Sequence, residues 1–119
     1  MILAMLAAAM TFTTLPSADE RDVRCLAFLS RAAGKVEGEQ RHRVDAGAIW
    51  YLGRLAARSP AIDPLAQVAT VLASPRYDRV AYEADKQRCH AQLQNLVTTY
   101  QAWATTYPAM TKAQTAPGK

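Results

Sequence analysis

The sequence predicts an all-α fold, a bundle-like single domain of four helices held by one disulfide. Four segments carry apolar residues at helical spacing, and no segment alternates between apolar and polar residues as a strand does. Prolines and glycines separate the segments, and a length of 119 residues suits one domain rather than two. The predicted organisation is a signal peptide over residues 1–18, a helical domain over 19–107 and a disordered tail over 108–119.

The N-terminal segment has the character of a leader. No charged residue precedes Asp19, and an apolar run from Ile2 to Ala9 leads into small and polar residues. The run is shorter than the about 20 residues that a membrane-spanning helix needs. A secretory signal peptide explains it, with cleavage expected after Ser17 or Ala18. Because no Lys or Arg precedes the run, a buried amphipathic helix is the alternative. The expected location is the periplasm or the outside of the cell, with no membrane attachment after cleavage.

The two cysteines predict a disulfide. Cys25 and Cys89 are the only cysteines, and an even number of cysteines is typical of a bridged exported chain. In the chain-entropy model, closing a loop of about 64 residues stabilises a fold by about 4 kcal/mol. Because His90 follows Cys89 directly, zinc binding, thiol catalysis and haem attachment are the alternatives.

These alternatives lack the residues that each chemistry needs. The chain has no C-x2-C motif for zinc and no C-x-x-C-H motif for covalent haem. Neighbouring residues on a helix point about 100° apart, so His90 is poorly placed to activate Cys89. A haem-binding four-helix cytochrome is a further alternative, but beyond the leader Met110 is the only methionine that could serve as a second axial ligand. We expect no cofactor and no metal, and His90 exposed beside a buried half-cystine.

The first predicted helix follows the leader. Ser17 and Glu20 have the spacing of a capping box, and Gly34 is a natural stop. A polar connector is expected over residues 35–43. The apolar side of the helix comprises Val23, Cys25, Leu26, Phe28, Leu29, Ala32 and Ala33.

The second predicted helix begins near Val44 and ends before Pro60, with Arg54 as the single charge of its central part. A helix that is apolar nearly all round belongs in the middle of a bundle. Gly47 and Gly53 weaken a helix, which predicts that a neighbouring helix approaches closely at both positions.

The third predicted helix is short and clearly bounded. Asp63 is a favourable N-cap, Pro64 a favourable first residue, and Ser74–Pro75 ends the segment. Its apolar stripe comprises Leu65, Val68, Ala69 and Leu72.

The fourth predicted helix is long, from about Arg76 to Tyr107, and Pro108 is expected to end it. About 30 helical residues extend roughly 45 Å, more than the diameter of a domain of this size. The helix should therefore bend, break near Asp78 or Asp85, or project. Its apolar residues recur at the spacing of a coiled-coil seam, at Tyr82, Cys89, Leu93, Leu96, Tyr100, Trp103 and Tyr107.

Aromatic and arginine side chains form the candidate partner surface. If the long helix projects, its last aromatic residues are exposed on one face and suit a protein partner; otherwise they pack on the first helix or on Trp50. Two arginines one turn apart could hold a carboxylate together, although such a pair is more often a solvated stripe. The long helix could also join two copies of the chain. The candidate surface comprises Trp50, Tyr51, Arg54, Arg58, Tyr100, Trp103 and Tyr107.

Charge and motifs narrow the function. The chain has 14 basic and 10 acidic residues, a net charge of +4, and the basic residues are spread out rather than clustered. This distribution does not favour nucleic-acid binding. The sequence lacks a nucleophile elbow, a phosphate-binding glycine loop and a paired-carboxylate motif, so we predict no catalytic residues and no enzyme.

The stretches RCLAFL, AIWYLGRL and QRCHAQL, together with the leader, resemble small helical periplasmic proteins of proteobacteria. The layout is similar to acid-stress chaperones of the HdeA type, in which one disulfide joins two helices. The resemblance implies that low pH converts a folded dimer into partly unfolded monomers that coat other proteins through apolar surface. Cys25 and Cys89 would then keep the partly unfolded chain compact. The chain departs from this family in being basic, with a pI near 9.3, so fewer carboxylates are available to drive unfolding in acid.

The chain also resembles helical immunity proteins that protect the periplasm from a cell-wall amidase. Those proteins pair a C-[IL]-A sequence on an early helix with a later cysteine, as Cys25 and Cys89 do here. This resemblance implies an inhibitor that plugs an enzyme cleft. The expected function is therefore to bind protein without catalysis, as a periplasmic stress chaperone or, alternatively, as an immunity protein.

Overall fold

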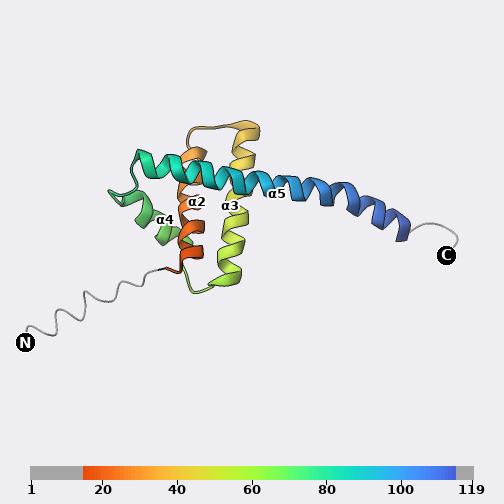
Figure 1. The fold of residues 1–119 in the computed structure, drawn as a ribbon, viewed down its shortest axis with the longest axis horizontal. Coiled ribbons are helices and arrows are strands. Elements are labelled where there is room, and N and C mark those ends of the chain that lie inside the picture. The colour runs from red at the N-terminus through yellow and green to blue at the C-terminus, as the bar shows by residue number, and fades with distance from the viewer. Residues whose placement is uncertain (1–14, 115–119) are drawn as a thin grey trace, which may run out of the picture. The chain divides into compact units, whose positions relative to one another are not determined.

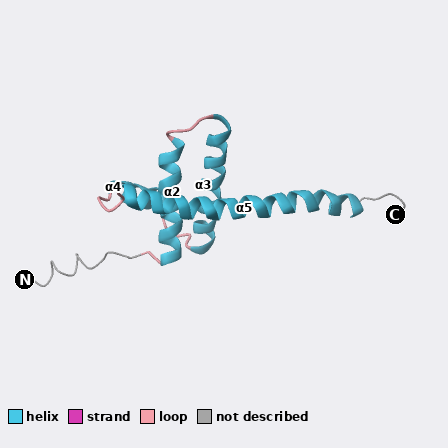
Figure 2. Ribbon diagram, turned by 45° about the horizontal axis from the view of Figure 1, so that its top comes forward, coloured by secondary structure: helices cyan, strands magenta, loops and turns pink. Residues whose placement is uncertain are grey.

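The computed structural model describes residues 15–114, and within them the chain is all-helical, without strands (Figure 2). The prediction of an all-α protein is confirmed. Most of the leader expected over residues 1–18 lies outside the described residues, as do residues 115–119. The helices are α2 (Ser17–Ala33), α3 (Gly38–Arg58), α4 (Pro64–Ala73) and α5 (Arg79–Gln114).

The chain divides after Ala73 into two compact units. The first unit contains α2, α3 and α4, and α2 contacts both other helices. Figure 1 shows α2 and α3 side by side and antiparallel, so that the beginning of α2 lies beside the end of α3. The second unit contains α5. The association of all four helices in one bundle stays a prediction.

Helix α2 supplies most of the core of the first unit. Its buried apolar side contains Val23, Leu26 and Leu29, as predicted, and the helix ends just before Gly34. The predicted capping box is wrong. Pro16 occupies the N-cap position and no side chain caps the helix, because Ser17 is already the first helical residue.

Helix α3 begins at Gly38, earlier than the sequence predicted, so much of the expected polar connector is helical. The entry to the helix explains the difference. Glu37 is extended, and Gly38 then takes a φ of +63°, a left-handed conformation that glycine adopts without steric cost. A Cβ at Gly38 would meet nothing within 4 Å, so backbone conformation, not space, requires glycine there.

Helix α3 is buried on one side only, so its predicted place in the middle of a bundle is wrong. Its buried residues are Gly47, Tyr51 and Leu55, one per turn, whereas Ile49 is 69% exposed. A Cβ built at Gly53 meets nothing within 4 Å, so no close approach occurs there. Helix α3 has more apolar residues than its one buried side can hold, so some of them, such as Ile49, are exposed.

Helix α4 begins at the residues that the sequence predicted. Asp63 Oδ1 accepts a hydrogen bond of 3.2 Å from the backbone N–H of Ala66, which satisfies a donor of the first turn. Pro64 is the first helical residue. Of the predicted stripe, Val68 is buried, whereas Leu65 is exposed.

Helix α5 starts later and ends later than predicted. Asp78 precedes the helix and caps it, its Oδ1 accepting a bond of 2.9 Å from the N–H of Ala81. No break occurs at Asp85, which is buried and paired with Arg88 at 3.3 Å. The helix continues through Pro108 to Gln114, so the predicted end at Tyr107, and with it the start of a disordered tail at 108, is wrong. A proline inside a helix removes one backbone donor. Along this exposed stretch water can satisfy the carbonyl that is left without a partner.

None of the helices within residues 15–114 combines the length and the apolar character needed to cross a membrane.

Candidate functional site

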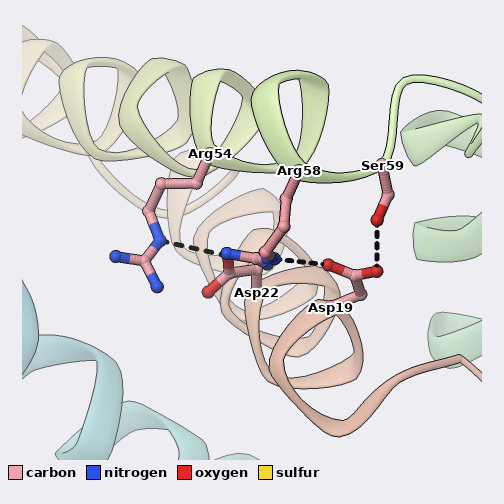
Figure 3. A network of polar contacts seen from close by, with 5 residues as sticks. All are labelled: Asp19, Asp22, Arg54, Arg58 and Ser59. Atoms are coloured by element: carbon pink, nitrogen blue, oxygen red, sulfur yellow. Dashed lines mark hydrogen bonds and ion pairs between the residues drawn. The ribbon is translucent and has the colours of Figure 1, made fainter.

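Two buried carboxylates of α2 meet the last turns of α3 in a network that the sequence analysis missed. Asp19 and Asp22 are 1% and 2% exposed. The antiparallel packing of α2 and α3 brings them beside Arg54 and Arg58, and Ser59 follows at the C-cap of α3. We call these five residues the carboxylate–arginine network (Figure 3).

Arg58 holds the network together. Its Nε donates to Asp19 Oδ1 and its Nη2 donates to Asp22 Oδ2, both at 2.7 Å. Arg54 Nε donates to Asp22 Oδ2 at 3.1 Å, and the Ser59 hydroxyl donates to Asp19 Oδ2 at 2.6 Å. Two carboxylates and two guanidinium groups balance in charge, which is the condition under which buried charges are tolerated.

The network shifts the acidity of its members. The hydrogen bond from Ser59, followed by that from Arg58, holds the pKa of Asp19 below its ordinary value, although burial opposes the shift. Hydrogen bonds to Asp22 and then Asp19 raise the pKa of Arg58. The network joins α2 to the end of α3 and to Ser59 through four hydrogen bonds.

The network makes the stability of the fold depend on acid. Because the pKa of Asp19 is lower in the folded than in the unfolded chain, its stabilising effect is fully present above the unfolded pKa, about 3.9. The effect is lost as the pH falls through the folded pKa. We expect Asp19→Asn to lower the melting temperature at pH 7, and the difference from the wild type to shrink as the pH falls below the unfolded pKa of about 3.9. Thermal unfolding followed by circular dichroism between pH 7 and pH 2 measures this, with the exposed Asp63→Asn as control; a difference that does not change with pH would contradict it.

The arginines of the candidate surface are thus occupied within the protein. Arg54 and Arg58 were expected to be able to hold a carboxylate together, and in the structure they pair with carboxylates of α2. The signal was present in the sequence. Two acids three residues apart, Asp19 and Asp22, lie near the start of the first predicted helix, and two arginines four residues apart lie near the end of the second. If the two helices are antiparallel, the start of the first lies beside the end of the second, and the acids can pair with the arginines.

The aromatic pair of α3 is divided between core and surface. Tyr51 is fully buried, so its predicted place on a partner surface is wrong. Trp50 is partly exposed, its ring lying edge-on to Tyr51 with centroids 4.9 Å apart. The guanidinium carbon of Arg54 lies 4.7 Å from the centre of the Trp50 ring, which is a cation–π contact. Arg54 therefore has two interaction partners within the protein, Trp50 and Asp22.

Cys25 and Cys89 form the predicted disulfide, and both residues are fully buried. Cys25 lies in α2 and Cys89 lies in α5. His90 is exposed, as predicted, while its neighbour Cys89 carries no free thiol. Within residues 15–114, no three His, Cys, Asp or Glu side chains gather where they could hold a metal ion. A disulfide is compatible with an oxidising, exported compartment.

The second half of α5 presents an exposed row of large side chains, which we call the α5 ridge. It comprises Tyr100, Trp103, Tyr107 and Met110, which are 61%, 55%, 51% and 59% exposed. The centroids of Tyr100 and Trp103 lie 5.9 Å apart, and Trp103 and Tyr107 are stacked at 4.9 Å. The aromatic members of the candidate surface on α5 therefore lie together on one side of one helix.

No family model, no curated protein and no solved structure matches this chain.

Proposed function

We propose that this chain is an exported protein that binds other proteins through the α5 ridge without catalysing a reaction, as a periplasmic stress chaperone does. The observation that carries the proposal is the exposure of four large side chains on one face of one helix. Soluble proteins rarely leave contiguous apolar surface uncovered unless it binds something. Tyr and Trp are also the residues most enriched at the energetic centres of protein interfaces.

The surroundings of the ridge favour a broad range of apolar partners. No charged residue occurs between Ala91 and Thr111. A surface without charges has no electrostatic means of rejecting a wrong partner. Aromatic side chains and a flexible methionine instead adapt to many apolar segments. Such a surface can bind unfolded proteins of many sequences.

The carboxylate–arginine network supports a role in acid stress. The sequence resemblance to acid-stress chaperones implied a fold that loosens at low pH, and the small number of acidic residues argued against it. Asp19, buried and ionised, provides one acid-sensitive contact between α2 and α3, since its protonation removes the ion pair with Arg58. This contact favours the chaperone over the immunity protein.

The test is suppression of aggregation of unrelated proteins. The full chain, oxidised, is mixed with reduced insulin chains at pH 7 and with an acid-denatured protein at pH 3, and light scattering is followed. We expect suppression by the wild type. Trp103→Ala/Tyr107→Ala should need a concentration at least about thirty-fold higher for the same effect, since each aromatic anchor contributes at least about 1 kcal/mol.

A matched control removes as much exposed apolar surface elsewhere. Ile49→Ala/Leu65→Ala changes two exposed apolar residues of the first unit and should suppress aggregation as the wild type does. Equal loss in both double variants, or no suppression by the wild type, would contradict the proposal. Capture of one protein at neutral pH without any general suppression would instead support the immunity function.

A further inference from the structure

We propose that the α5 ridge of one chain binds the same ridge of a second copy, forming a reversible helix-to-helix homodimer. This inference rests on the proposed function of the ridge as a protein-binding surface, and it names the partner that occupies the surface when no other protein does.

The spacing of the apolar residues fits a helix partner. From Leu93 onward they recur at alternating intervals of three and four, the a/d pattern by which one helix packs along another. The pattern continues through the part of α5 that the sequence analysis assigned to a tail, since Met110 extends it beyond Pro108. The complete series is Leu93, Leu96, Tyr100, Trp103, Tyr107 and Met110.

The residues beside this series favour a second copy. In most coiled coils the flanking positions carry charges that select the partner, whereas here they carry none between Ala91 and Thr111. When two identical faces meet, a charged position that lies near the symmetry axis faces the same charge of the second copy. A face without charges avoids that repulsion, and no complementary charge is required from a foreign partner.

Two flanking threonines already have hydrogen-bond partners within α5. The hydroxyl of Thr99 donates to the backbone oxygen of Asn95 at 3.0 Å, and that of Thr106 donates to the oxygen of Ala102 at 2.9 Å. A polar group that keeps its hydrogen bond can be covered at little cost. The ridge can therefore be buried together with its flanks without leaving these hydroxyl donors unsatisfied.

The size of the ridge predicts a moderate affinity. A large aromatic side chain buries about 150–250 Å², and the ridge residues are about half exposed, so two copies would bury about 1,000 Å² in total. This area lies at the lower end of specific interfaces. Trp103 stacks on Tyr107 and makes a tilted contact with Tyr100. These contacts order the three rings before binding, which reduces the entropy lost on association. A dissociation constant of roughly 1–100 µM is expected, which leaves the ridge accessible to other proteins.

Sedimentation equilibrium of the oxidised full chain, from about 1 µM to about 500 µM, tests the proposal. The wild type should change from monomer to dimer across this range. Tyr100→Glu/Tyr107→Glu places charges in the seam of both copies and should weaken the dimer at least ten-fold. Gln94→Glu/Gln101→Glu adds the same charges on the other side of α5 and should leave the dissociation constant within about two-fold. If the seam variant fails to fold by circular dichroism, Trp103→Ala replaces it and should weaken the dimer by a similar factor.

The outcomes separate this inference from the proposed function. A wild type that stays monomeric at about 500 µM, or a control that dissociates as readily as the seam variant, would overturn the dimer. If the chain suppresses aggregation but never dimerises, the dimer proposal is contradicted and the proposed function is supported. If the chain forms a dimer that the seam variant weakens but suppresses no aggregation, the dimer proposal is supported and the proposed function is contradicted.

Discussion

Replacing both cysteines, as Cys25→Ala/Cys89→Ala, is expected to lower the free energy of unfolding by about 4 kcal/mol, the largest effect of any change that we predict. The reason lies in the unfolded chain. The bond closes a loop of about 64 residues, and its removal gives the unfolded state the conformations that the loop had excluded. A domain of this size is stable by only about 5–15 kcal/mol, so a large part of its stability depends on this one bond.

Urea unfolding followed by far-ultraviolet circular dichroism measures the effect. The wild type treated with a reductant should show nearly the same free energy as the double variant, because both lack the same cross-link. A melting temperature lower by roughly 15–30 °C is the corresponding thermal result. A loss below about 1 kcal/mol would show that the bond constrains the unfolded chain far less than its loop length implies.

Leu55→Ala is expected to lower the free energy of unfolding by about 3 kcal/mol. Leu55 is 1% exposed, and it lies one turn from Tyr51 on the buried side of α3. Truncation removes its apolar contacts and leaves a cavity that the surrounding helices fill only in part. The same helix offers a matched control in Leu52, which is 41% exposed.

The comparison of the two leucines tests which face of α3 is buried. Leu52→Ala removes the same atoms from the same helix and should change the free energy by less than about 1 kcal/mol. Urea unfolding of both variants at pH 7 gives the two values. Equal losses would mean that α3 is covered on both sides, as the sequence had suggested.

Local signals predicted the helices well. Asp63 and Pro64 define the start of α4 because a side-chain cap and a fixed φ act within a few residues of chain. The cysteine pair followed from the count alone, since two cysteines allow a single pairing. The beginning of α3 was missed because residues 35–43 are polar and were expected to form a connector, whereas the positive φ of Gly38 forms the entry to the helix.

Features that depend on the packing of helices were predicted less well. The apolar composition of α3 indicated burial on all sides, but burial depends on how many neighbours a helix has, which composition does not contain. The carboxylate–arginine network joins residues more than thirty positions apart, so it requires the antiparallel arrangement of α2 and α3. The continuation of α5 past Pro108 was missed because proline disfavours a helix interior by a cost that the rest of a long helix can offset.

The burial of Asp19 limits how much of the chain can be trimmed from its N-terminal side. Export is proposed to remove the residues up to Ser17 or Ala18, and either cut leaves Asp19 in place. A cut one residue beyond Ala18 would delete the carboxylate that accepts from both Arg58 and Ser59, and would leave Arg58 with a single anionic partner. An aminopeptidase that removed one residue too many would therefore produce a chain with a weakened contact between α2 and α3. If the chain is processed as proposed, the accuracy of the cut is a condition for the stability of the product.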